Sequence, residues 1–280
     1  MKSKFNIILL ILFIFFSVSS HIFADNDLDI KAKQIEIDKK NSEIILTDSV
    51  EIRDNKLNFI KTNKASYNKT KKLVKTVGDT NIITSQNYKI NSSNVIFDDL
   101  NGKIASNFFT QITDKEGNIV EVEMFNYDRN KNLFFAKGEI KVTDIKQNTY
   151  YFSEIYINEL ENKIIGSDLR AYLNDNSIKV DSKNDPRIFS NSLSISNKKS
   201  KMGKGVFTFC NLKDEGKCPA WAIQADKIEH DPAKKTIYYT NAVLKIFDFP
   251  IFYFPKFFHP DPTVKRQTGF LSPSFEDGKN

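Results

Sequence analysis

Apolar and polar residues alternate through most of the chain in short runs that favour β-strands. Between residues 25 and about 180 these runs are rich in Ile, Val, Phe, Tyr and Thr, and clusters of Asn, Asp and Lys separate them. An alternation of period two places apolar side chains on one face of a strand and polar ones on the other. The pattern therefore predicts an all-β fold built from half-buried antiparallel strands.

A repeat of thirty residues runs through this region. Its turn residues are Asp38, Asn68, Asp98, Asp128 and Asn158. The apolar pairs that precede them are Ile35 and Ile37, Ala65 and Tyr67, Val95 and Phe97, Phe125 and Tyr127, and Ile155 and Ile157. Six positions after the turn residues stand Ile44, Val74, Ile104, Phe134 and Ile164. The unit is thus a hairpin repeated five times, and such units have to stack on one another to bury their apolar faces.

The repeat is predicted to end near Pro186. A sixth turn would fall at position 188, which Ile188 occupies. Residues 181–205 are rich in Ser, Asn and Lys, which favours an irregular crossing over further hairpins. Strands are predicted to resume at residues 206–209, 221–228 and 236–246.

The alternation leaves open what the apolar faces of the hairpins cover. Two sheets that close tightly would form a sandwich with a dry core. The same faces in a slightly opened, twisted roll would line a trough for apolar chains. The pattern alone does not choose between them, although the dry core is favoured because most inward-facing residues simply pack.

The N-terminus has the layout of a signal peptide. Lys2 and Lys4 precede an apolar run over residues 5–16, and small and polar residues lead to Ala24. Cleavage after Ala24 removes both lysines and no acidic residue, so the formal charge falls from +6 to +4. Such a mild basic excess suits an anionic partner and ordinary solubility alike. We expect residues 1–24 to be a signal peptide and the mature chain to be exported.

Candidate catalytic and metal-binding chemistry is sparse. In an exported chain Cys210 and Cys218 are disulfide candidates, and a local bridge would contribute about 2–3 kcal/mol. His230 lies beside Asp231 and Pro232 in a predicted turn, and His259 stands among prolines. These residues make no convincing set of nucleophile, base and acid, and two ligands make a weak metal site. We therefore predict no enzyme, no metal and no cofactor.

Residues 249–273 differ from the rest of the chain because they hold five of its eight prolines and a dense run of aromatic residues. A proline removes one hydrogen-bond donor from a β-ladder, so an ordinary core strand is not expected here. The stretch is predicted to be an extended connector between two structural regions. Its aromatic residues suit a membrane belt, a plug between domains or an unusual core strand.

The same stretch carries a motif. It contains Pro-Ile-Phe-Tyr-x-Pro at residues 250–255 and Lys-Arg-x-x-Gly-Phe-Leu-x-Pro at residues 265–273. Upstream, residues 207–210, Trp221, residues 230–231 and residues 241–242 extend the pattern. These residues resemble the LptD family, also called OstA or Imp, of outer-membrane lipopolysaccharide-assembly proteins. Thr268 departs from the family, in which a serine usually precedes the glycine.

The resemblance implies a fold and a set of site residues. It implies an OstA-like β-jellyroll over residues 25–205, strands and a connector over residues 206–266, and the start of a transmembrane β-barrel, truncated here, over residues 267–280. The resemblance also implies an acyl-chain trough, and the repeat offers as its lining residues Ile35, Ile37, Val95, Phe97, Phe125, Tyr127, Ile155 and Ile157. The implied barrel entry and gate comprise Gly269, Phe270, Leu271 and Pro273. In the family, the cysteine that matches Cys210 pairs with one in the distant barrel, so that pairing and a local bridge to Cys218 both stay open.

The resemblance also implies partners and a location. The jellyroll would receive lipopolysaccharide from an LptA-like periplasmic bridge at the edge strand near residues 30–37, and the barrel would enclose an LptE-like lipoprotein. The chain would belong to the outer membrane, with residues 25–205 in the periplasm and no role in binding nucleic acid. One alternative is a soluble shuttle of the LptA or LptC type. Another is a secreted β-solenoid adhesin or polysaccharide-binding module, which would have a dry core and repeats beyond residue 188.

Overall fold

Strands account for every regular element that the structure describes. The computed structural model describes residues 28–54, 58–173, 187–208, 221–260 and 264. The first ten strands are β1 (Asp29–Lys31), β2 (Gln34–Asp38), β3 (Glu43–Arg53), β4 (Phe59–Asn68), β5 (Leu73–Ile83), β6 (Lys89–Ser93), β7 (Ile96–Asp98), β8 (Lys103–Ser106), β9 (Thr110–Thr113) and β10 (Ile119–Val122). The remaining strands are β11 (Met124–Asp128), β12 (Leu133–Thr143), β13 (Thr149–Asn158), β14 (Lys163–Tyr172), β15 (Arg187–Ser196), β16 (Lys199–Thr208), β17 (Trp221–Asp231), β18 (Thr236–Ile246) and β19 (Phe249–Pro260). The predicted all-β fold is confirmed.

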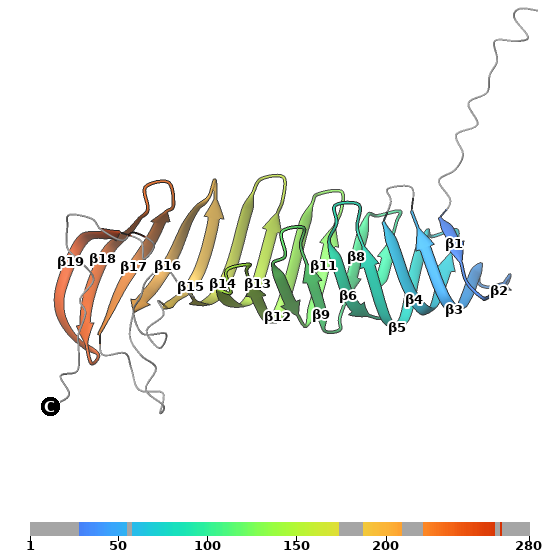
Figure 1. Cartoon of the computed structure of the whole chain (residues 1–280), viewed down its shortest axis with the longest axis horizontal. Helices are drawn as coiled ribbons and strands as arrows, with labels where there is room; N and C mark the ends of the chain where they lie inside the picture. The colour runs from blue at the N-terminus through green and yellow to red at the C-terminus, as the bar shows by residue number, and fades with distance from the viewer. Residues whose placement is uncertain (1–27, 55–57, 174–186, 209–220, 261–263, 265–280) are drawn as a thin grey trace, which may run out of the picture.

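The strands follow one another along the long axis of the molecule, with β1 and β2 at one end and β19 at the other (Figure 1). All pairings are antiparallel, and from β12 to β18 each strand pairs with the one before and the one after it. Earlier in the chain, short strands share the same path: β5 pairs with both β6 and β7, and β12 with both β10 and β11. The result is a continuous stack of hairpins.

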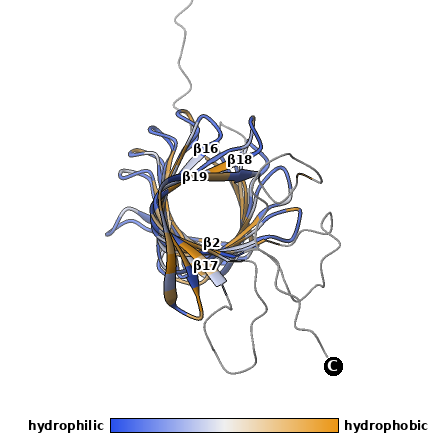
Figure 2. Cartoon of the chain, turned by 90° about the vertical axis from the view of Figure 1, so that its left-hand side faces the viewer, coloured by the Kyte–Doolittle hydropathy of each residue, from blue (hydrophilic) through white to orange (hydrophobic). Residues whose placement is uncertain are grey.

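Long strands bend halfway, and the bends also recur every thirty residues. The backbone enters the left-handed region at Asp48, Gly78, Gly138 and Asp168, and again at Lys204 and Asn241. The strand register shifts beside several bends, as between residues 137 and 140. Elsewhere the strand is interrupted instead, as between β6 and β7. Each bend divides its strand into two segments, so the bends together divide the stack into two halves. The end-on view in Figure 2 shows that these halves curve around the long axis.

The five predicted turns are confirmed. In each, the side-chain oxygen of the repeat residue accepts a hydrogen bond from a backbone N–H two or three residues on, at 2.9–3.0 Å. Four residues after the repeat residue, each turn has one left-handed residue: Ser42, Lys72, Gly102, Asn132 and Asn162. Short polar side chains at the first position therefore replace backbone partners that the turn cannot supply.

The predicted irregular crossing over residues 181–205 is wrong where the structure describes it. Strands β15 and β16 form a regular hairpin whose two turn residues, Asn197 and Lys198, are both left-handed. Such a two-residue turn matches the twist of the flanking strands. The Ser, Asn and Lys residues that suggested a crossing alternate with Ile188, Leu193 and Met202, which face the core. The sheet thus continues through position 205, inside β16, to β19.

The proline-rich stretch is a strand as far as Pro260, and not a connector outside the sheet. Within the described residues β19 pairs with β18 alone, so one of its edges carries no neighbouring strand. An edge strand tolerates proline because its outer N–H groups have no ladder partner to lose. The buried side chain of His259 joins β19 to β18, since its Nε2 lies 2.7 Å from the hydroxyl oxygen of Tyr239.

Substitutions of Gly78 test the importance of the left-handed bend for stability. No atom lies within 4 Å of the position that a Cβ would occupy there, so a larger side chain meets no steric clash. Only backbone strain should therefore matter. We expect Gly78→Val to lower the free energy of unfolding by about 1–2 kcal/mol, the cost of a left-handed conformation for an ordinary residue. Gly78→Asn should cost clearly less, because asparagine tolerates this region. Denaturant unfolding of both variants checks the bend, and equal losses would contradict it.

The buried bond between Tyr239 and His259 predicts a pH-dependent stability. We expect Tyr239→Phe to cost about 1–3 kcal/mol, and Tyr238→Phe on the same strand to cost less. Burial raises the pKa of Tyr239 above its ordinary value. The stabilising contribution is therefore complete below about pH 10 and is lost as the pH rises through the folded-state pKa. Unfolding curves between neutral and alkaline pH should show a smaller alkaline loss for Tyr239→Phe than for the parent chain.

Candidate functional site

Three rows of inward-facing residues run along the long axis, and the strand registers give the first and third without a gap and the second in two parts. The first row comprises Ile37, Ile44, Tyr67, Val74, Phe97, Ile104, Tyr127, Phe134, Ile157, Ile164, Ile195, Ser200, His230, Ile237 and His259. The second row comprises Ile35, Leu46, Ala65, Thr76 and Val95, then Phe125, Ala136, Ile155, Gly166, Leu193, Met202, Ile228, Tyr239 and Phe257. All eight residues predicted to line the trough lie on these two rows.

The third row lies beyond the bends, on the other half of the stack, and the sequence reasoning missed it. It comprises Ile30, Ile52, Ile60, Ile82, Ile90, Ile112, Val120, Val142, Tyr150, Ala171, Ile188, Phe207, Ile223, Leu244 and Phe252. A signal for it was present, because Ile52, Ile82, Ile112 and Val142 repeat at thirty residues. The register of a strand beyond a bend cannot be inferred from its alternation before the bend. The thirty-residue spacing of these four residues was therefore the one signal that could have located this row.

Side chains from the two halves pack together in one core. Val95, Phe97, Phe125 and Ile155 are buried, and Tyr127 and Ile157 are half-buried against them. Phe207 of the third row lies 5.1 Å from His259 of the first row, between ring centroids. Because protein cores are closely packed, an apolar chain could lie along the rows only if the two halves moved apart.

Polar groups in this core are concentrated beside the bends and satisfy one another. The hydroxyl of Thr80 donates to that of Thr76 at 2.7 Å, and the hydroxyls of Ser92 and Thr110 lie 2.7 Å apart. Buried hydroxyl groups are costly unless they are hydrogen-bonded. Along the bends the interior therefore contains polar groups that are hydrogen-bonded to one another, and along the three rows it is mainly apolar.

The rows begin at an uncovered end. Ile35 is 55% exposed and Ile37 is 65% exposed, although their paired neighbours Leu46 and Ile44 belong to the core or pack against it. The reason is that β2 pairs only with β3 among the described strands. Two of the predicted trough residues thus present their apolar side chains to solvent.

The rows end at β19, whose aromatic residues divide between core and surface. Phe254 and Phe257 pack against the core, with their ring centroids 5.3 Å apart. In contrast, Phe249, Phe252 and Phe258 are exposed. Both ends of the interior therefore present apolar side chains.

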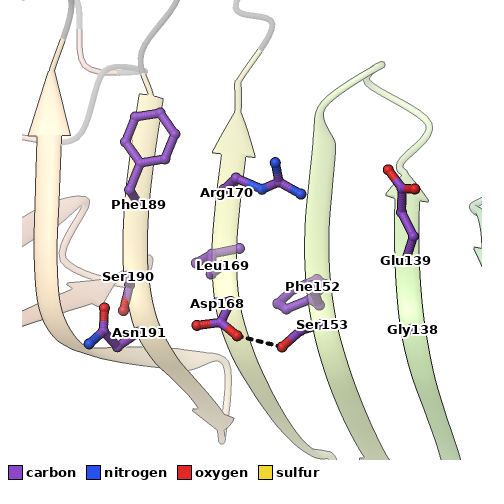
Figure 3. A pocket seen from close by; sticks show the side chains of 10 residues that line it. All are labelled: Gly138, Glu139, Phe152, Ser153, Asp168, Leu169, Arg170, Phe189, Ser190 and Asn191. Atoms are coloured by element: carbon purple, nitrogen blue, oxygen red, sulfur yellow. Dashed lines mark hydrogen bonds between the residues drawn. The ribbon is translucent and has the colours of Figure 1, made fainter. Parts of the chain in front are cut away.

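A shallow hollow of about 480 Å³ lies along the bends of β12 to β15 (Figure 3). It is lined by Gly138, Glu139, Phe152, Ser153, Asp168, Leu169, Arg170, Phe189, Ser190 and Asn191. The Ser153 hydroxyl donates to Asp168 at 2.6 Å, the interaction drawn in Figure 3. This set offers mixed charge at the surface and lies outside the three rows.

Several predicted residues lie outside the described ranges or have structural roles. Cys210, Cys218, Gly269, Phe270, Leu271 and Pro273 lie outside the described residues. Asp231, next to His230, accepts backbone hydrogen bonds in the β17–β18 turn and pairs with Lys199 at 3.0 Å. Among the described residues, no group of three His, Cys, Asp or Glu side chains could hold a metal ion, and no helix is long and apolar enough to cross a membrane.

Parts of the chain are similar to proteins named LPS-assembly protein LptD. No family model matches the chain. The LPS-assembly protein LptD of Pseudomonas aeruginosa (strain UCBPP-PA14) is 38% identical over 71 residues, which are 25% of this chain and 7% of that protein. LptD of Pseudoalteromonas translucida is 41% identical over 69 residues, 25% of this chain and 9% of its own length.

A longer match covers more of the chain. LptD of Idiomarina loihiensis is 28% identical over 151 residues, which are 51% of this chain and 18% of that protein. The chain thus spans less than a fifth of the length of these three relatives. These partial matches support a relationship between the chain and LptD proteins.

Proposed function

We propose that this chain is the N-terminal, periplasmic part of an LptD-like protein and carries lipopolysaccharide toward the outer membrane. The observation that carries the proposal is the set of three largely apolar rows, which run along the stack, and two of which emerge uncovered at β2. The partial matches to LPS-assembly proteins agree with it. The activity is transport without covalent chemistry.

The rows suit the acyl chains of an amphiphile. Burying apolar surface stabilises a bound chain by roughly 25 cal/mol per Å². Successive strands contribute similar apolar residues to each row. An acyl chain that moves along the rows by one strand therefore exchanges one set of apolar contacts for a similar set. Sugars and phosphates of the same lipid would stay in water at the edge of the stack. The interior thereby holds the lipid without fixing it at one point.

The two ends would meet different partners. At β2, the exposed side chains of Ile35 and Ile37 and the unpaired strand edge suit a further strand from an LptA-like bridge. At the other end, the exposed aromatic residues of β19 precede the segment proposed to begin a transmembrane barrel with an LptE-like lipoprotein. In this proposal residues 1–24 are a signal peptide, and residues 25–205 form the core of an OstA-like jellyroll in the periplasm.

A β-solenoid adhesin or polysaccharide-binding module is the second candidate. Two observations favour it, namely the packed interior and the regular hairpins beyond residue 188. A ring pair on the outer surface, Phe135 and Tyr156 at 4.6 Å, would suit sugar stacking. The relatives named as LPS-assembly proteins favour the transport function instead.

Photocrosslinking in cells tests the transport function. The chain is expressed with its natural downstream sequence and carries a photoreactive phenylalanine analogue at Phe125 or Ile157. We expect lipopolysaccharide adducts from both positions, because both lie on the inward rows. The control is Asn126, whose exposed side chain lies next to Phe125 but on the outer face. Adducts equally strong at Asn126, or absent at both inward positions in a folded chain, would contradict transport through the interior.

The end at β2 can be tested separately. We expect Ile37→Asp to reduce the crosslink at Phe125 several-fold while changing the free energy of unfolding by less than about 0.5 kcal/mol, as is usual for exposed positions. The matched control is Leu160→Asp, because Leu160 is 72% exposed but lies in a turn far along the stack from β2. Equal effects of the two variants on the crosslink would argue against lipid arrival at β2.

A further inference from the structure

The two rows of turns meet along one long edge of the stack. One row, called rim A, holds the turns after Asp38, Asn68, Asp98, Asp128 and Asn158. The other, called rim B, holds the turns at residues 84–88, 114–118 and 144–148, together with Asp54 and Asn58 between β3 and β4. Between residues 43 and 158, each bent strand runs from one rim across its bend to the other. Side-chain contacts that join rim A to rim B therefore close the edge opposite the bends.

The first such contact centres on Arg129 of rim A. Its Nη1 lies 3.2 Å from Asp54 of rim B, and its Nη2 lies 2.8 Å from Asp99 of rim A. The side chains of Arg129 and Asp54 are only 9% and 3% exposed. The guanidinium also stacks on Phe97 of the first row, 4.6 Å from the ring centroid. The ion pair thus lies directly over the apolar interior.

The second contact joins Tyr88 of rim B to Glu159 of rim A. The Tyr88 hydroxyl donates to Oε1 of Glu159 at 2.7 Å. Tyr127 of the first row lies near the same carboxylate, and burial together with Glu159 raises the pKa of Tyr127 to about 12. Burial and Glu159 also raise the pKa of Tyr88. Both phenols therefore remain neutral hydrogen-bond donors at neutral pH.

Both contacts can be released at modest cost. Charges removed from water lose their hydration, and this loss offsets much of their mutual attraction. Within the described residues the buried Nε of Arg129 has no hydrogen-bond partner, which adds to the cost of the closed state. Separation of the rims would return Arg129, Asp54 and Glu159 to water. The difference in free energy between the closed and the open edge is thus smaller than it would be if apolar contacts alone joined the two rims.

We propose that the contacts of Arg129 with Asp54 and of Tyr88 with Glu159 are two clasps that close the long edge through which an acyl chain reaches the interior. The proposal rests on the proposed function. It adds that the acyl chains of a lipid that arrives at β2 pass sideways between the rims into the interior, and that this opening requires both clasps to separate. Phe97 and Tyr127 lie beside the clasps, so they are the first interior residues that an entering chain would meet.

Hydrogen exchange of the purified chain without lipid tests the clasps themselves. Tyr88→Phe keeps the ring and removes one hydrogen bond to a carboxylate. We expect amides of the strands that end at the two rims to exchange about tenfold faster or more, as the loss of a charge-assisted bond implies. The matched control is Tyr156→Phe, because the Tyr156 hydroxyl donates to Glu154 at 3.2 Å on the same strand and joins no rims. Equal exchange in the two variants would overturn the proposal.

A reversible crosslink tests the entry path. Tyr88→Cys and Glu159→Cys are combined in a chain whose Cys210 and Cys218 are replaced by serine, and a bifunctional thiol reagent cleavable by reductant joins the rims. We expect the joined chain to take up purified lipopolysaccharide at least tenfold more slowly, and reductant to restore uptake. Uptake by the joined chain at the rate of the free chain would overturn lateral entry. Should the parent chain also take up no lipid, the proposed function fails, and hydrogen exchange alone decides whether the clasps exist.

Discussion

The bend in the middle of each long strand is the constraint on which the rest of the structure depends. A stack of unbent hairpins would be a flat sheet with one apolar face in water. The bend turns that face onto itself, so that the first two rows pack against the third. Left-handed residues such as Asp48 and Asp168 make the bend at a cost of about 1–2 kcal/mol each. Burial of large side chains such as Phe97 and Phe125, at about 1.5–3 kcal/mol each, offsets this cost.

Folding a repeated hairpin upon itself produces an interior that is uniform along its length. Each repeat adds one rung to every row, and neighbouring repeats cover one another. Strands β2 and β19 have no such cover within the described chain, so Ile35 and Ile37 at one end and several aromatic residues of β19 at the other stay exposed. For the proposed function, a uniform apolar interior with two apolar ends suits the movement of an elongated ligand better than its capture at one place.

The same fold leaves one edge that backbone hydrogen bonds do not close. Strands pair with their neighbours along the axis, but rim A and rim B belong to different halves, and side chains join them. A salt bridge and a phenol–carboxylate bond are contacts that water can replace, whereas the apolar rows resist exposure. Lateral separation at the rims is therefore the least costly way to open the packed interior.

Local information in the sequence determined the strands, the turns and the first two rows. Alternation along a strand and a short polar residue at a turn act between neighbours in the chain, so Asp128 could be placed in a turn and Phe125 on an inward face without a structure. The hairpin at Asn197 and Lys198 was missed because its serine-rich strands resemble a loop in composition, although their apolar residues alternate.

Only the tertiary structure decided how the two halves meet. The bend breaks the alternation, so the pattern before it cannot show that Ile52 and Ile82 share one core with Phe97 and Phe125. Arg129 and Asp54 are 75 residues apart and lie in turns that appear solvent-exposed in sequence, yet the folding of the sheet buries both. Contacts of this kind depend on how far each strand bends and twists, which is a property of the whole stack and not of any one repeat.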